Sequence, residues 1–207
     1  MYQPAHARFI EDRAEELHKL IREYPLGTLV TQRGSSIDIN HVPFLIDDSG
    51  SSVKLTAHVP RANPVWQGLD GRSVLIVFHG PNAYISPNWY PSKEQHGKVV
   101  PTWNYAVVHA HGAARTIEDK MWLRNHLDEL TGTHERRFGR PWKVADAPAD
   151  YIDKLLGAIV GLEINVTRLE GKFKLGQNRP KEDQNGVLAG LATIDSPLAR
   201  FVGEYIA

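Results

Sequence analysis

The sequence VKLTAHV at residues 53–59 sets the fold class, because its side chains alternate between apolar and polar. An alternation with a period of two places the apolar residues on one face of a half-buried strand. The other predicted strands lie at residues 26–30, 37–46, 73–80, 82–86, 105–113 and 158–169. About seven strands separated by Gly- and Pro-bearing turns predict an antiparallel barrel or sandwich.

Helices interrupt these strands and do not alternate with them. Residues 10–24 carry apolar side chains at helical spacing and end at Pro25. A second helix is predicted from a Thr116 cap through Leu130, and a third begins at Pro148. The predicted fold is therefore mainly β with peripheral and C-terminal helices (α+β content), in a single domain spanning residues 1–207.

The apolar residues on either side of His41 change phase. Ile37 and Ile39 share one phase of the alternation, whereas Val42 and Phe44 share the other. A β-bulge or a bend near His41 would account for the slip, and the neighbouring Pro43 supports it, because sheets accept proline at edges, strand starts and bulges.

Composition excludes several kinds of chemistry. The 207 residues contain no cysteine, which removes disulfides, thiolate metal sites and Cys nucleophiles. Lys and Arg total 24, as do Asp and Glu, so charge-driven nucleic-acid binding is disfavoured. The charged N-terminus lacks a signal-peptide core, and the longest purely aliphatic or aromatic run covers only residues 74–78. These features predict a cytoplasmic protein that does not enter membranes.

Aromatic and proline residues concentrate between residues 60 and 105. The segments YISPNWY at 84–90 and VVPTWNY at 99–105 carry most of these rings. Rings on stiff loops are typical of pocket walls for a flat ligand. The alternative is that each ring only closes one end of the barrel.

Two polar segments are candidates for binding an anion, although GxGxxG and P-loop motifs are absent. TAHVPRAN at 56–63 brings a hydroxyl, an imidazole, a guanidinium and an amide to the end of one strand. Arg61, next to Pro60, is predicted to be the main anchor of a ligand phosphate. GKFKLGQNRPK at 171–181 has four cations and no acid, which favours either a solvated surface or a loop that closes over an anionic or heterocyclic ligand.

His109 and His111 lie two apart on a predicted strand, so their side chains share one face. A metal site would need a third ligand, for which His58 or His79 is a candidate. No HExxH spacing supports such a site, so hydrogen-bonded strand histidines and no metal are predicted. No Gly-x-Ser-x-Gly motif or paired carboxylates indicate a catalytic nucleophile or acid-base pair.

Five motifs in one order resemble the PaiB-type family of FMN-binding negative transcriptional regulators. These motifs are MYQPAHARF, LTAHVPRANPVW, YISPNWY, VVPTWNYAVVHAHG and EGKFKLGQNR, and the resemblance runs from Met1 to about Leu191. It implies a split β-barrel of the FMN-binding, pyridoxamine-phosphate-oxidase-like type. It also implies a homodimer with flavin sites between subunits, FMN as the cofactor and transcription regulation as the role.

The resemblance also implies which residues bind FMN. Ile39, Asn40 and His41 would lie along the isoalloxazine, and Ala57, His58, Arg61 and Asn63 would meet the ribityl phosphate. Trp103, Asn104, Lys172, Lys174, Gln177 and Asn178 would come from elsewhere in the barrel or from the partner chain.

Several functions fit this pattern. The first is a flavin protein with a regulatory output, and the second is an FMN-dependent oxidoreductase acting on a small substrate. Direct DNA repression would depend on the basic clusters at 136–143 and 172–181, because no helix-turn-helix is recognisable. Haem binding is a fourth alternative, since split barrels also host haem. No catalytic residue is predicted.

Overall fold

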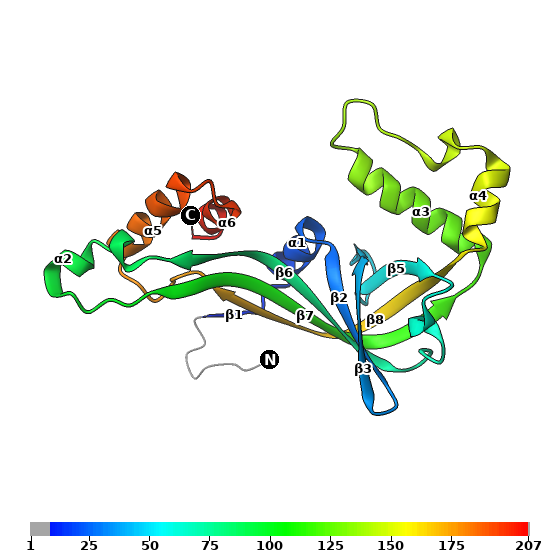
Figure 1. Cartoon of the computed structure of the whole chain (residues 1–207), viewed down its shortest axis with the longest axis horizontal. Coiled ribbons are helices and arrows are strands. Elements are labelled where there is room, and N and C mark those ends of the chain that lie inside the picture. The colour runs from blue at the N-terminus through cyan, green and yellow to red at the C-terminus, as the bar shows by residue number, and fades with distance from the viewer. Residues whose placement is uncertain (1–8, 207) are drawn as a thin grey trace. The chain divides into compact units, whose positions relative to one another are not determined.

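A computed structural model describes residues 9–206, with no side-chain description for Glu204 and Ile206 (Figure 1). The first eight residues, which include most of the MYQPAHARF motif, lie outside this range. The strands are β1 (Ile10–Glu11), β2 (Leu26–Arg33), β3 (Ser36–Pro43), β4 (Leu45–Asp47), β5 (Lys54–Pro60), β6 (Ser73–Ile85), β7 (Thr102–Ile117) and β8 (Ile159–Lys174). The helices are α1 (Ala14–Glu23), α2 (Ser92–His96), α3 (Lys120–Glu135), α4 (Ala149–Leu156), α5 (Lys181–Thr193) and α6 (Pro197–Ile206).

The strands form one eight-stranded sheet in the order β3-β2-β6-β7-β8-β5-β4, with β1 paired to β8. The pairs β1–β8, β2–β3, β2–β6, β4–β5 and β5–β8 are all antiparallel. The path ends at β3 and β4, so the sheet does not close on itself among the described residues. The predicted fold class, mainly antiparallel β with added helices, is confirmed.

Strand β6 is longer than predicted. Residues 73–80 and 82–86 were expected to form separate strands, but one strand runs from Ser73 to Ile85 through Gly80. A Cβ on Gly80 would lie 2.9 Å from Leu20 Cδ1 and 3.1 Å from the Ala106 oxygen. The glycine is thus required by the close approach of neighbouring atoms and does not mark a turn.

Two helices begin later than the sequence pattern predicts. Ile10 and Glu11 form β1, opposite Lys172 and Gly171, and α1 starts only at Ala14. The cap of α3 is Asp119, whose carboxylate accepts a hydrogen bond of 2.7 Å from the Trp122 N–H. The carboxylate therefore satisfies one of the free N–H groups at the start of the helix, in place of the expected Thr116.

No β-bulge forms at His41, so that part of the prediction is wrong; the strand is interrupted at Phe44 instead. β3 pairs with β2 in an unbroken register from Ser36 to Pro43. Ile37 and Ile39 are 68% and 60% exposed, whereas Val42 is buried, so the two apolar sets occupy opposite faces of one regular strand. The chain leaves this pairing only at Phe44, whose N–H donates to the Pro25 oxygen at 2.9 Å.

The chain divides into two compact units. The first unit comprises residues 1–24, 79–109 and 170–207, and the second comprises residues 25–78 and 110–169. In the first unit α5 contacts α6 (Figure 1), and the Phe173 and Phe201 rings pack edge to face at 5.7 Å. In the second unit α3 contacts α4, and Leu123 of α3 and Ile152 and Leu156 of α4 form a buried cluster with Val144 from the segment between the two helices.

No helix among the described residues is long and apolar enough to cross a membrane.

Candidate functional site

Two cavities of the first unit contain predicted site residues, and the larger of these two has a volume of about 510 Å³. It is lined by His79, Gly80, Asn82, Trp103, Tyr105, Ala106, Val107, His109 and Lys172. Trp103, Tyr105, Val107 and His109 occupy alternate positions of β7, so the strand presents them on one face. The cavity thus arises from the period-two geometry of long strands.

Aromatic rings and polar groups alternate in this larger cavity. The Trp103 side chain is 51% exposed, and its Nε1 donates to Asn82 Oδ1 at 3.1 Å. Tyr84 packs against Trp103 with ring centroids 6.3 Å apart. Lys172 Nζ lies 6.0 Å from the centroid of the Tyr105 ring. Ring faces for stacking, together with nearby hydrogen-bonding groups, suit a flat heteroaromatic ligand.

A smaller cavity of about 120 Å³ also belongs to the first unit. Its lining residues are Phe9, Tyr90, Val100, Pro101, Thr102, Asn104, Lys174, Gly176, Asn178 and Arg179. Gln177 lies outside the lining and supports it, since its Oε1 accepts from the Leu175 N–H at 2.9 Å and its Nε2 donates to the Phe173 oxygen. The side chain of Gln177 thereby fixes the turn that follows β8.

The thirteen predicted FMN-binding residues divide between the two units. The first unit contains Trp103, Asn104, Lys172, Lys174, Gln177 and Asn178, and all of these but Gln177 line one of the two cavities described above. Ile39, Asn40, His41, Ala57, His58, Arg61 and Asn63 belong to the second unit.

Arg61 already has protein partners. Its Nη1 pairs with Glu118 Oε2 at 2.5 Å, and its Nε and Nη2 donate to the backbone oxygens of Gly157 and Ile159 at 3.0 and 3.3 Å. The guanidinium also lies 5.7 Å from the Trp66 ring. A ligand phosphate at Arg61 would have to replace Glu118.

His58 faces α3. Its Nδ1 lies 3.2 Å from His126 Nε2, and the His126 ring stacks on Trp122 at 5.3 Å. Burial lowers the pKa of both imidazoles, and the pKa of His126 falls to about 4 because burial is reinforced by the proximity of His58. Among the described residues, the buried His126 Nδ1 has no hydrogen-bond partner. Burial therefore favours the neutral form of both rings.

The other predicted residues of the second unit lie on or beside β3 and β5. Asn63 Nδ2 donates to Asn40 Oδ1 at 2.7 Å, and Thr28 Oγ1 lies 3.2 Å from His41 Nδ1. Ile39 is 60% exposed, while Ala57 is fully buried and offers no side-chain surface to a ligand.

The residues implied by the resemblance do not include His79, Asn82 and Tyr105 of the larger cavity or Thr102, Tyr90 and Arg179 of the smaller one. Four of these six residues lie in the segments 84–90, 99–105 and 171–181, which the sequence had indicated as pocket walls or as a loop over a ligand. His79 and Asn82 gave no such signal, because the Gly80–Pro81 pair resembled a turn.

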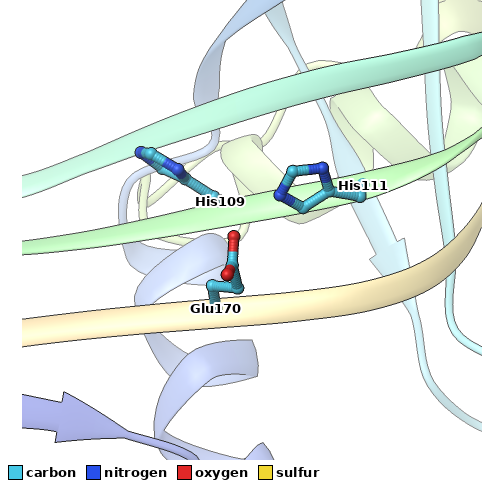
Figure 2. Close-up of side chains that lie close together, drawn as sticks. All are labelled: His109, His111 and Glu170. Atoms are coloured by element: carbon cyan, nitrogen blue, oxygen red, sulfur yellow. The ribbon is translucent and has the colours of Figure 1, made fainter. Parts of the chain in front are cut away.

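Figure 2 shows His109 and His111 on β7 with Glu170 on β8. One nitrogen from each histidine and one carboxylate oxygen lie within 4.8 Å of one another. Glu170, and neither His58 nor His79, is thus the third group beside the histidine pair. Arg168 Nη2 lies 3.3 Å from His111 Nε2, so a guanidinium charge already occupies the position next to one ring nitrogen.

Comparison with known proteins identifies the family of the chain. Residues 1–168 match the family model described as "Putative FMN-binding domain". The chain belongs to this family. Residues 169–207, which contain both cations that line the smaller cavity, Lys174 and Arg179, lie beyond the matched region.

A bacterial and a fungal relative align with nearly the whole chain. It is 32% identical over 205 residues to the protease synthase and sporulation protein PAI 2 of Bacillus subtilis, covering 99% of this chain and 95% of the relative. It is also 32% identical over 227 residues to an uncharacterized protein of Emericella nidulans, covering 92% of this chain and 90% of the relative.

Among solved structures, the FAD and heme binding protein from Mycobacterium smegmatis is similar, with a TM-score of 0.60 at 18% identity. The match covers 84% of this chain and 78% of the neighbour. The likeness confirms the split-barrel fold, and the family is a flavin-binding one.

Proposed function

We propose that this protein binds FMN and that the larger cavity of the first unit receives the isoalloxazine ring. The observation that carries the proposal is the cavity of about 510 Å³ whose walls are Trp103 and Tyr105, in a chain of an FMN-binding family. The indole and phenol faces supply stacking surfaces, while Asn82 and His79 supply groups that hydrogen-bond the polar edge of the ring. When bound, the flavin would supply electron or hydride transfer; the residues named here bind and orient it.

The choice of FMN is supported by the family, and it is tested against FAD and haem, which the name of one structural neighbour mentions. The neighbour named for FAD and heme makes haem the second candidate, to which the histidines beside the cavity are suited. Purified protein is titrated separately with FMN, FAD, riboflavin and haem, with flavin fluorescence and Soret absorbance as readouts. FMN is expected to bind most tightly. Tighter binding of haem, or no flavin binding at all, refutes the proposal.

A homodimer is part of the proposal. Leu26, Ile37 and Ile39, on the paired strands β2 and β3, are each at least 60% exposed, which is apolar surface that a second copy would bury. Light scattering at micromolar concentration is expected to give about twice the 23.2 kDa chain mass. A stable species of the single-chain mass contradicts a homodimer.

The proposed output is regulatory, with bound flavin acting as a sensor and the protein acting as a negative regulator of transcription. The relative named for protease synthesis and sporulation supports this role. The alternative is an oxidoreductase that needs a hydride donor. Consumption of NADH or NADPH by the FMN-loaded protein, measured with and without added small acceptors, separates the two. Sustained turnover would refute a purely regulatory role.

Direct contact with DNA is tested separately, because equal numbers of acidic and basic residues disfavour it. Mobility-shift assays at low salt, with flavin-free and FMN-loaded protein, are expected to show no binding to duplex DNA. A shift that depends on the flavin would instead identify the protein as the repressor itself.

A further inference from the structure

The smaller cavity of the first unit combines two cations with two amide side chains, of which Asn104 is buried. We propose that it binds a tetrahedral oxyanion, namely the phosphate group of a phosphorylated small molecule, through Lys174, Arg179 and Asn104. The inference goes beyond flavin binding, since its evidence is the lining of this cavity alone.

The two cations are held in place without a counter-ion. Lys174 Nζ donates to Thr102 Oγ1 and, at 2.8 Å, to the Trp103 oxygen. The Arg179 guanidinium lies 4.7 Å from the centroid of the Tyr90 ring. Within residues 9–206, neither Lys174 nor Arg179 forms an ion pair with a carboxylate. Two fixed, uncompensated cations in one small space attract an anion.

The electrostatics of Lys174 agree with this geometry. Burial lowers the pKa of its ammonium, and the charges of Lys172 and Arg179 lower it further. Positive charges therefore crowd this end of β8, and an anion in the cavity would relieve their repulsion.

Asn104 adds a hydrogen-bond donor to the wall of the cavity. It is only 2% exposed and lines the cavity. Its side-chain amide can donate hydrogen bonds to the oxygens of an anion bound there. Asn178 places a second amide at the exposed side of the cavity.

Gly176 keeps the space beside Asn104 open. Its φ of +89° lies in the region that favours glycine, and a Cβ there would lie 3.7 Å from Asn104 Nδ2. A larger side chain would both strain this turn and narrow the cavity.

The volume of the smaller cavity limits which chemical group can enter it. About 120 Å³ corresponds to the space of roughly four water molecules in the liquid. This is enough for a phosphate group and too little for a flavin or purine ring. The phosphorylated end of a molecule would enter, and the remainder would lie outside the cavity.

Inorganic phosphate is the direct probe. The full chain, free of flavin, is titrated at constant ionic strength and followed by ³¹P NMR and calorimetry. Wild type is expected to bind phosphate, and Lys174→Met and Arg179→Met are each expected to weaken binding by about tenfold or more. The matched control is Lys181→Met, an exposed cation of the same basic segment that does not line the cavity, and it is expected to change the affinity less than twofold.

Circular dichroism and thermal unfolding show whether each variant folds. Asn178→Asp, at an exposed position, keeps the test decisive if the lysine or arginine variant unfolds, because a carboxylate at the cavity edge should repel phosphate. Failure of wild type to bind phosphate, or equal affinity in wild type and the folded cavity variants, overturns the proposal.

A comparison of FMN with riboflavin distinguishes the source of the phosphate. If the occupant is the FMN phosphate, inorganic phosphate will compete with FMN, and Arg179→Met, which does not touch the wall of the larger cavity, will weaken FMN binding while leaving riboflavin binding unchanged. If the occupant is another phosphorylated molecule, phosphate and FMN will bind together, and Arg179→Met will leave the affinity for FMN intact. Both results require an oxyanion site. Loss of flavin binding with phosphate binding retained would overturn only the proposed flavin function.

Discussion

Lys174 donates a hydrogen bond of 2.8 Å from its Nζ to the backbone oxygen of Trp103. The Trp103 indole lines the larger cavity, and the Lys174 ammonium lines the smaller one. One hydrogen bond thus ties the wall of the proposed ring site to the charge of the proposed oxyanion site. Tests of the two sites consequently need separate variants.

Trp103→Ala is expected to weaken FMN binding by about 2- to 10-fold. The substitution removes the stacking between the indole and the flavin ring, which contributes about 0.5–1.5 kcal/mol in addition to the burial of apolar surface. Trp103→Phe should recover most of the affinity. Fluorescence titration measures both. The control is Trp142→Ala, an exposed tryptophan outside the cavity, which should leave the dissociation constant unchanged. Equal affinities of wild type and Trp103→Ala would place the ring elsewhere.

Arg61 can act as the phosphate anchor only if it exchanges Glu118 for the ligand. On that proposal Arg61→Ala weakens FMN binding by roughly 10- to 150-fold, as expected for loss of a charge-assisted contact. Glu118→Gln should strengthen FMN binding, since it releases the guanidinium. Calorimetric titration of both variants with FMN tests this role of Arg61. Unchanged dissociation constants for FMN in both variants would leave Arg61 with only its structural contacts to Gly157 and Ile159.

The stability of the protein is expected to fall as the pH drops from about 6.5 to about 4. The pKa of His126 is about 4 in the folded chain and near 6.5 when unfolded, so the unfolded state binds more protons between these values. The largest loss from this group is about 3 kcal/mol.

Urea unfolding at pH 7 and pH 5 measures this loss. His126→Leu should reduce the difference between the two pH values, while His134→Ala on the same helix should preserve it. A difference that is unchanged in His126→Leu would assign the acid sensitivity to other groups.

Gly112→Ala is expected to destabilise the fold by about 1–3 kcal/mol, because a Cβ at this position of β7 would lie 2.4 Å from the Asn165 backbone oxygen. The backbone would have to shift to accommodate it. Gly139→Ala, where a Cβ meets no atom within 4 Å, is the control and should change the unfolding free energy by less than about 0.5 kcal/mol. Thermal and urea unfolding of both variants provide the comparison, and equal stabilities would show that the strands adjust freely.

The sequence by itself determined which segments form strands, although it divided β6 in two, and its motifs indicated the family. Residues 53–59 were predicted as a half-buried strand and form β5, because alternation directly reports which side chains a sheet buries. The motifs around Trp103 and Lys174 likewise selected residues that line cavities. These features depend on neighbours close in the chain, which a single sequence displays.

Only the tertiary structure decided which groups meet. Arg61 pairs with Glu118, which lies 57 residues away in the sequence, and no local pattern indicates that these two side chains meet. The regular course of β3 past His41 also depends on its partner strand β2. Pairing with β2 continues without interruption from Ser36 to Pro43, although the apolar residues change from one face of the strand to the other. The smaller cavity joins Tyr90, Asn104 and Arg179 from three separate segments. Contacts between distant segments are fixed by packing and strand pairing across the whole unit, so the periodicity of each segment cannot specify them.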